Sequence, residues 1–201
     1  MHYETHFKCV VVGASAGGMV ALGKLFSMLP RTFPLSIIAV QHLHPSEGGY
    51  LPVFLARKCA LPVKEVEDKM PVLKGHVYIA PANYHLLVEM DESFSLSIDA
   101  RVNYSRPSID VLFESAARVW GADLIGIILT GANQDGTNGL RKIKECGGMT
   151  MAQDPETAET PFMPSAAIDA GVVDRVMTLE KIGAFLSTID AEASNLRCSK
   201  W

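Results

Sequence analysis

Three continuous apolar runs place the strongest constraint on the fold of this chain. They are FKCVVV (7–12), LSIIAV (35–40) and LIGIILT (124–130). Continuous apolar runs are typical of strands buried on both faces, as in a parallel sheet covered by helices. Amphipathic helical patterns occupy residues 17–29, 108–120, 136–146 and 178–189. The alternation of strand and helix predicts an α/β fold, a three-layer, doubly wound, mostly parallel sheet.

One region breaks this rhythm. Residues 76–98, HVYIAPANYHLLVEMDESFSLSI, have turn-forming residues at 81–83 and at 91–93. This pattern predicts antiparallel strands, which we place at an edge of the sheet. The chain of 201 residues is ordinary for one globular domain, and we expect that domain over residues 1–193 with a C-terminal tail over 194–201.

Composition and charge narrow the functional classes. The net charge is −4 with no basic stripe, which argues against a nucleic-acid partner. No apolar run is long enough to cross a bilayer and the N-terminus does not resemble a signal peptide, so we expect a cytoplasmic protein without membrane insertion. The four cysteines are scattered, with no CxxC pair and no histidines at zinc spacing, so no metal site is predicted.

The glycine-rich stretch GASAGG (13–18) joins the first apolar run to the first helical pattern. A dinucleotide site would need glycine where Ser15 stands and an acidic residue about 20 positions later, and both are missing. The spacing Gly13-x-Ser15-x-Gly17 instead matches a nucleophile elbow, although the same spacing also occurs in plain tight turns. In the elbow interpretation, the backbone amides of Ala16 and Gly17 lie where they could stabilise an oxyanion.

A serine nucleophile needs a histidine base within reach. His42 directly follows the second apolar run, and the carboxyl ends of parallel strands meet at one edge of a sheet. His44 is a competitor, although Pro45 after it suggests a loop that turns away. His85 could line the same cleft or simply pair within the antiparallel segment. We therefore predict His42 as the base and expect it near hydrogen-bonding distance of Ser15 Oγ.

The carboxylate that would orient the base comes from LIGIILTGANQDG (124–136). Its apolar run ends in a loop that carries Asp135, again at the carboxyl edge of the sheet. Taken alone, Asp135 is better explained as a helix N-cap. Three strand ends that deliver Ser15, His42 and Asp135 to one edge together favour a Ser-His-Asp triad, with Asp135 on the far side of the imidazole from Ser15.

Six ordered blocks of the chain resemble the catalytic domain of the CheB-type chemotaxis protein-glutamate methylesterases. They are VVVGASAGG, VQHLHP, VYIAPANYHLLV, RPSIDVLFESAA, ILTGANQDG and AQDPETAETPFMPSAAIDAGVVD. The resemblance implies that Ser15 is the nucleophile, His42 the base and Asp135 the acid. It also implies a doubly wound fold with an antiparallel portion, and no cofactor.

The activity that the resemblance implies is hydrolysis of methyl esters on glutamate side chains of chemoreceptor helices, through an acyl-enzyme and with release of methanol. Family members commonly carry a receiver domain as well. The sequence leaves open whether this chain acts alone, belongs to a longer protein or has a regulatory partner chain. Two alternatives also remain open: a protein-glutamine deamidase on the same scaffold, and a non-catalytic module that binds receptors.

The chain departs from the family pattern at two places. GASTGG reads GASAGG here, so Ala16 lacks a hydroxyl, and TGMGxDG reads TGANQDG, so Ala132 and Asn133 replace Met and Gly. We expect the region of Ala132 to contribute to oxyanion or substrate binding. Arg106, in RPSID, either orients an acidic receptor segment or is a surface arginine before a helix.

Overall fold

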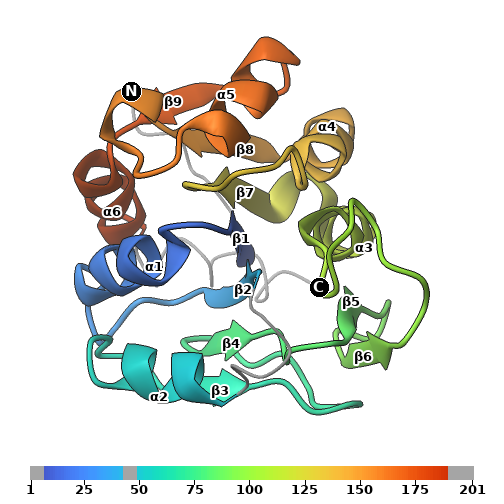
Figure 1. The fold of residues 1–201 in the computed structure, drawn as a ribbon. Coiled ribbons are helices and arrows are strands. Elements are labelled where there is room, and N and C mark those ends of the chain that lie inside the picture. The colour runs from blue at the N-terminus through green and yellow to red at the C-terminus, as the bar shows by residue number, and fades with distance from the viewer. Residues whose placement is uncertain (1–6, 43–48, 190–201) are drawn as a thin grey trace, which may run out of the picture.

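The structure is a computed structural model that describes residues 7–42 and 49–189. Helices cover both faces of a central sheet (Figure 1). The tail expected over 194–201 and the competing His44 lie outside the described residues.

All neighbouring strands of the seven-stranded sheet pair in parallel, in the order β3-β4-β2-β1-β7-β8-β9. The strands are β1 (Cys9–Ala14), β2 (Ser36–Gln41), β3 (Val63–Glu65), β4 (Val77–Ile79), β7 (Leu124–Ile128), β8 (Met149–Gln153) and β9 (Arg175–Met177). The three apolar runs form β1, β2 and β7, the neighbouring strands at the centre of the sheet. The predicted doubly wound α/β fold is confirmed.

The helices agree with the expected ranges to within two residues at each end. They are α1 (Gly18–Ser27), α3 (Ile109–Trp120), α4 (Thr137–Glu145) and α6 (Leu179–Ser187). The structure adds the shorter helices α2 (Tyr50–Ala56) and α5 (Phe162–Asp169), and the 3-10 turns Gly121–Asp123 and Pro155–Thr157.

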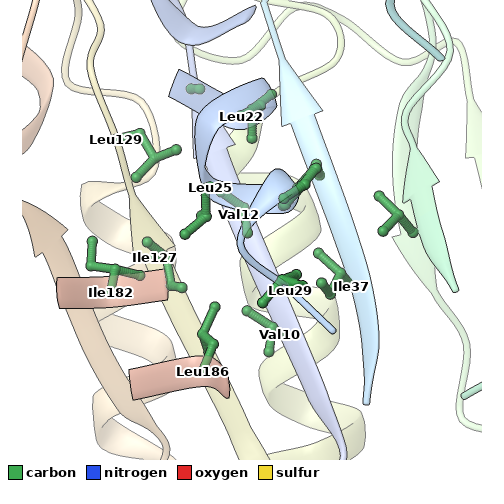
Figure 2. Packing of buried hydrophobic residues seen from close by; sticks show 14 of the residues in the cluster. Val10, Val12, Leu22, Leu25, Leu29, Ile37, Ile127, Leu129, Ile182 and Leu186 are labelled. Carbon is green, nitrogen blue, oxygen red and sulfur yellow. The ribbon is translucent and has the colours of Figure 1, made fainter. Parts of the chain in front are cut away.

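Alternate residues of each central strand supply two separate cores. Val10 and Val12 of β1 pack with α1, α2 and α6 on one face. Figure 2 shows this packing, with Leu22 and Leu25 of α1 and Ile182 of α6 over the strands. Cys9 and Val11 point to the other face, where α3, α4 and α5 pack. Because both faces are covered, the strands must be apolar throughout, which explains the continuous runs.

The antiparallel segment differs from the expectation in its position. Within residues 76–98, Val77–Ile79 form β4, which pairs in parallel between β3 and β2. Only β5 (His85–Val88) and β6 (Phe94–Ser97) are antiparallel, and they form a separate two-stranded sheet. Leu86, Val88 and Phe94 are buried in the same core as α3, so the hairpin covers the helical layer and does not extend the main sheet.

The direction of winding reverses at the centre of the sheet. After β1 the chain forms β2, β3 and β4, which all lie on one side of β1. It later returns to form β7 on the opposite side of β1. In doubly wound folds the crevice for ligands lies at the carboxyl ends of the strands beside such a reversal. The carboxyl ends of β1, β2 and β7, at the centre of the sheet in Figure 1, therefore mark the candidate site.

Candidate active site

The register of the three central strands places the predicted triad at one level of the sheet. Ala14 at the end of β1 pairs with Gln41 at the end of β2, and Gly13 pairs with Ile128 of β7. Ser15 and His42 are the next residues after the paired strand ends. Asp135 follows β7 in the loop before α4. Parallel pairing thus brings together three residues that are 27 and 93 positions apart in sequence.

Backbone hydrogen bonds fix the turn that carries Ser15. The Ser15 N–H donates to Thr130 O at 3.0 Å, and the Gly18 N–H donates to Ser15 O at 2.8 Å. The positive φ of the turn lies at Gly17 (77°), and Ser15 is not among the described residues with positive φ. The left-handed conformation of this turn is therefore adopted by Gly17 and not by Ser15, and for a glycine this conformation has little cost.

Gln41 ties the ends of β1 and β2 together. Its buried side-chain amide donates to Ser15 O at 2.7 Å and to His42 O at 2.9 Å. A Cβ on Gly18 would lie 2.0 Å from Gln41 Oε1, so only glycine leaves room for this side chain. Gln41 therefore positions the predicted nucleophile and base through their backbones.

His42 and Asp135 form a buried pair. His42 Nε2 lies 2.8 Å from Asp135 Oδ2, and the two side chains are 12% and 0% exposed. Since an ionised carboxylate only accepts hydrogen bonds, neutral His42 carries its proton on Nε2. The ring nitrogen with the lone pair is then Nδ1. The arrangement leaves Nδ1 as the base that would take a proton.

Asp135 also accepts hydrogen bonds from the first turn of α3. Its Oδ2 receives the Ile109 N–H at 2.7 Å, and its Oδ1 receives the Ser108 hydroxyl at 2.8 Å and the Asn103 amide at 2.9 Å. Burial acts to raise the pKa of Asp135, but the hydrogen bonds from His42, Asn103 and Ile109 outweigh it and hold this pKa below its usual range. Asp135 is therefore not the N-cap of the helix that follows it, α4, whose N-cap is Gly136; its side chain instead accepts hydrogen bonds at the start of α3.

A second buried aspartate repeats this arrangement in reverse. Asp110 of α3 accepts from the Gly136 and Gly139 N–H groups at the start of α4, at 2.9 and 2.7 Å. The Asn103 amide donates to both carboxylates, at 2.8 Å to Asp110 and 2.9 Å to Asp135. Burial, with the nearby charge of Asp135, raises the pKa of Asp110. Asp135 in the loop before α4 thus caps α3, and Asp110 in the first turn of α3 caps α4.

The free nitrogen of His42 faces two side chains. Asn133 Nδ2 lies 3.4 Å from Nδ1, and Ser105 Oγ lies 3.5 Å from it. Within residues 7–42 and 49–189, Ser15 Oγ makes no hydrogen bond. Hydrogen bonds of a catalytic site are often formed only once substrate binds. The structure thus contains the His42–Asp135 half of the expected geometry, and the Ser15–His42 bond is not formed.

The expected oxyanion donors lie beside Ser15. In the part of the chain that the structure describes, the N–H groups of Ala16, Gly17 and Ala132 have no acceptor. Ala16 is exposed, and its carbonyl accepts the Thr130 hydroxyl at 2.8 Å, which holds the peptide in place. Backbone donors at the start of α1 are suited to binding a negative oxygen.

Arg106 is placed against the loops that border the site. Its Nη1 donates to Ile98 O at 2.7 Å and to Asp99 O at 3.0 Å, and its Nη2 donates to Asn83 Oδ1 at 3.0 Å. Its Nε is buried and has no partner among the described residues. Arg106 therefore joins the segment before β5 to the segment after β6.

His85 is buried, and both of its ring nitrogens have partners. It is 2% exposed, and its two ring nitrogens bond to Ala100 O at 3.0 Å and to the Ser108 N–H at 3.2 Å. It also pairs with Ser97 within the hairpin. Of the two interpretations of His85, pairing within the antiparallel segment agrees with this position.

The described residues hold no group of three or more His, Cys, Asp or Glu side chains placed to bind a metal ion. No described helix is long and apolar enough to cross a membrane.

Several supporting residues gave no sequence signal. Gln41, Asn103, Ser105, Ser108 and Asp110 were not predicted as site residues. Asn103 lies in a turn with φ of 49° and is followed by Tyr104 with φ of 63°, a pairing typical of a tight reversal. The run of turn-forming residues around 103 could have indicated the reversal, but nothing local indicates that its amide reaches two carboxylates.

The dependence of stability on pH should report the state of Asp135. Its folded-state pKa lies below the unfolded value, so its contribution to stability is present at neutral pH and is lost as the pH falls through the folded-state pKa. Asp110 has the opposite sign because its pKa is raised on folding. We expect the difference in unfolding free energy between wild type and Asp135→Asn to shrink as the pH falls below about 4, the pKa of an unfolded aspartate. Urea unfolding measures this, and a constant difference would contradict the expectation.

Comparison with known proteins agrees with this architecture. The family model described as CheB methylesterase matches residues 10–186. A relative from Leptospira interrogans is 49% identical over 92% of this chain and 96% of its own length. Relatives from Carboxydothermus hydrogenoformans and Thermotoga maritima are 43% and 38% identical and are named protein-glutamate methylesterase/protein-glutamine glutaminase. The chain spans about half of their length, 52% in each case.

A solved structure gives the same result. The crystal structure of the Thermotoga maritima CheB methylesterase catalytic domain matches with a TM-score of 0.87 and 37% identity, over 90% of this chain and 97% of that one. The family match, the relatives and the shared fold lead to one conclusion: the chain belongs to the CheB methylesterase family.

Proposed function

We propose that this protein hydrolyses methyl esters of glutamate side chains on chemoreceptors, with Ser15 as nucleophile. The observation that carries the proposal is the buried pair of His42 and Asp135, 2.8 Å apart, beside the turn that holds Ser15. A serine becomes a useful nucleophile only with such a base, and the base needs a carboxylate to orient it. Family membership supplies the ester as the substrate class.

The first half of the reaction follows from the ring nitrogens of His42. Nε2 is hydrogen-bonded to Asp135, so Nδ1 takes the proton of the Ser15 hydroxyl as Oγ attacks the ester carbonyl. The carbonyl oxygen becomes negative and is held by backbone N–H groups near Ala16, Gly17 and Ala132. Asp135 stabilises the imidazolium that forms.

Collapse of the tetrahedral intermediate completes the acylation. The bond from carbon to the methoxy oxygen breaks, and His42 Nδ1 returns its proton so that methanol leaves. A water molecule then attacks the acyl-enzyme with His42 again as base. The second intermediate releases Ser15 and a free glutamate side chain. In this proposal Arg106 supports substrate binding indirectly, because it holds together the segment before β5 and the segment after β6.

Deamidation of glutamine is the second candidate activity. Attack on a primary amide uses the same nucleophile and base and releases ammonia in place of methanol. Relatives named for both activities favour it. In either case the partner is a chemoreceptor helix, and a regulatory chain is a further proposed partner. A non-catalytic, receptor-binding module is the alternative that the experiment must exclude.

Methanol release from a methylated chemoreceptor tests the proposal. We expect the wild type to release methanol and Ser15→Ala to release none above background, because the substitution removes only the attacking oxygen. Ammonia from a glutamine-bearing receptor, measured in parallel, reports the deamidase. Equal results for the wild type and Ser15→Ala in both assays would reject both activities and leave receptor binding, which a pull-down with the same receptor measures.

A further inference from the structure

We propose that Asn133 is a positioning residue whose amide donates to the free ring nitrogen of His42, holding the base neutral and aligned until substrate binds. This inference rests on the proposed function. It concerns a position at which the chain departs from the pattern TGMGxDG, since Asn133 stands in place of a glycine.

The orientation of the Asn133 amide is determined by the loop. Its Oδ1 accepts the Asp135 N–H at 3.1 Å, an Asx turn within the segment from 133 to 135. With the oxygen fixed there, the other end of the amide, Nδ2, faces His42 Nδ1 at 3.4 Å. The two ends of one side chain thus contact the acid of the predicted triad and its base.

A donor at Nδ1 has a defined effect on the proton of His42. Because Nε2 donates to Asp135, a second donor at Nδ1 is satisfied only when Nδ1 carries its lone pair. In the imidazolium, Nδ1 is also a donor and would face the Asn133 amide unfavourably. Asn133 therefore favours the state of His42 that can accept the proton of Ser15, and it must give way as that proton arrives.

The other groups around the ring do not replace this role. Ser105 Oγ is 3.5 Å from Nδ1 and also 3.4 Å from Asn103 O, an acceptor to which it can donate instead. The charged groups of this cluster are Asp135, bonded to Nε2, and Asp110, which is connected to Asp135 through Asn103. Glu159 packs against Gly17 in the neighbouring turn. Each of these carboxylates favours the protonated, imidazolium form of His42. A neutral donor that faces Nδ1 favours the neutral form and so opposes them.

Asn133→Asp separates this role from a structural one. Aspartate has the same shape and keeps an oxygen for the Asp135 N–H, so the turn is preserved. It changes only the group that faces Nδ1, from a donor to a negatively charged acceptor. If the side chain at position 133 serves the turn without facing Nδ1, the added charge affects His42 no more than a charge at an exposed neighbouring position does. If it acts on Nδ1, the imidazolium is placed between two carboxylates and is strongly favoured.

The matched control is Gln134→Glu, which adds the same charge at an exposed neighbouring position. Long-range 1H–15N spectra of the His42 ring give the tautomer and the titration midpoint without any substrate. We expect the wild type to carry its proton on Nε2, and Asn133→Asp to move the midpoint upward by about 1–2 pH units. Gln134→Glu should move it by about 0.3 units or less.

The pH profile of kcat/KM for methanol release provides the second readout. Its acidic limb should move to higher pH in Asn133→Asp by the same amount as the midpoint, and should stay in place in Gln134→Glu. Asn133→Ser tests the amide donor without adding a charge: it removes the amide that faces Nδ1 and keeps an oxygen for the Asp135 N–H, and a smaller upward shift is expected.

Failure of this inference is distinct from failure of the proposed function. A wild type that releases no methanol rejects the function, while the ring titration still decides the role of Asn133. A wild-type ring protonated on Nδ1 would overturn the inference. Equal midpoints in the wild type and Asn133→Ser would overturn it as well, whatever the midpoint of Asn133→Asp, because a charge added at this position favours the imidazolium by itself.

Discussion

Replacing Asp135 by asparagine should lower kcat/KM for methanol release by about 10³-fold to 10⁴-fold. The carboxylate accepts from His42 Nε2 and the Ile109 N–H through Oδ2, and from the Ser108 hydroxyl and the Asn103 amide through Oδ1. An amide offers one oxygen and one NH₂ group, so it cannot accept at both ends. An NH₂ group facing Nε2 would force the proton of His42 onto Nδ1, which removes the lone pair that Ser15 needs.

Asp110→Asn is the matched control for this result. It makes the same chemical change in the other buried carboxylate, which shares the Asn103 amide with Asp135 but does not contact His42. We expect a loss of less than about tenfold in kcat/KM, since the substitution alters the cap of α4 and the bond to Asn103 but leaves the pair of His42 and Asp135 in place. Equal losses in the two variants, measured at matched folded fractions, would show that the integrity of the cluster matters and the tautomer of His42 does not.

The largest effect on stability is expected from Phe113→Ala, a loss of about 3–5 kcal/mol in the free energy of unfolding. Phe113 lies on α3, is fully buried and belongs to the core shared with α4. A Cβ on Gly139 of α4 would lie 2.4 Å from Phe113 Cβ, so the two helices touch at this point. Removal of the ring leaves a cavity between α3 and α4. The first turns of these two helices donate hydrogen bonds to Asp135 and Asp110, respectively.

Phe162→Ala provides the control with the same chemical change. Phe162 on α5 is 56% exposed, so much of its ring is in water in the folded protein. We expect a loss of about 1 kcal/mol or less, measured with Phe113→Ala by urea unfolding monitored by circular dichroism. Similar losses in the two variants would contradict the assignment of Phe113 to the packing between α3 and α4.

The main architecture was predictable because burial on both faces leaves a direct trace in the sequence. A strand such as β1 has no face on which a polar residue is tolerated, so its apolar run is continuous. The four longer helices show periodic patterns of apolar residues because one side of each helix faces solvent and the other faces the core. The shorter helices α2 and α5 have only seven and eight residues, too few for a period to be distinguished from chance.

The position of the antiparallel hairpin was not predictable from its own residues. Alternation of side chains is the same for a strand at the edge of a sheet and for a strand in a separate hairpin. The choice depends on which surface the apolar face meets. For β5 and β6 that surface is α3, through Leu86 and Phe94, while Val77–Ile79 insert between two strands of the main sheet.

By itself, the sequence determined the fold class and the proximity of Ser15, His42 and Asp135, because residues after neighbouring parallel strands must share one edge of the sheet. Their catalytic roles stay predictions. Only the tertiary structure decided which ring nitrogen of His42 faces Asp135, that Asp135 caps α3, and that Asn133 faces Nδ1. These contacts join loops far apart in sequence, and their geometry depends on how α3 and α4 pack, which no local pattern of residues encodes.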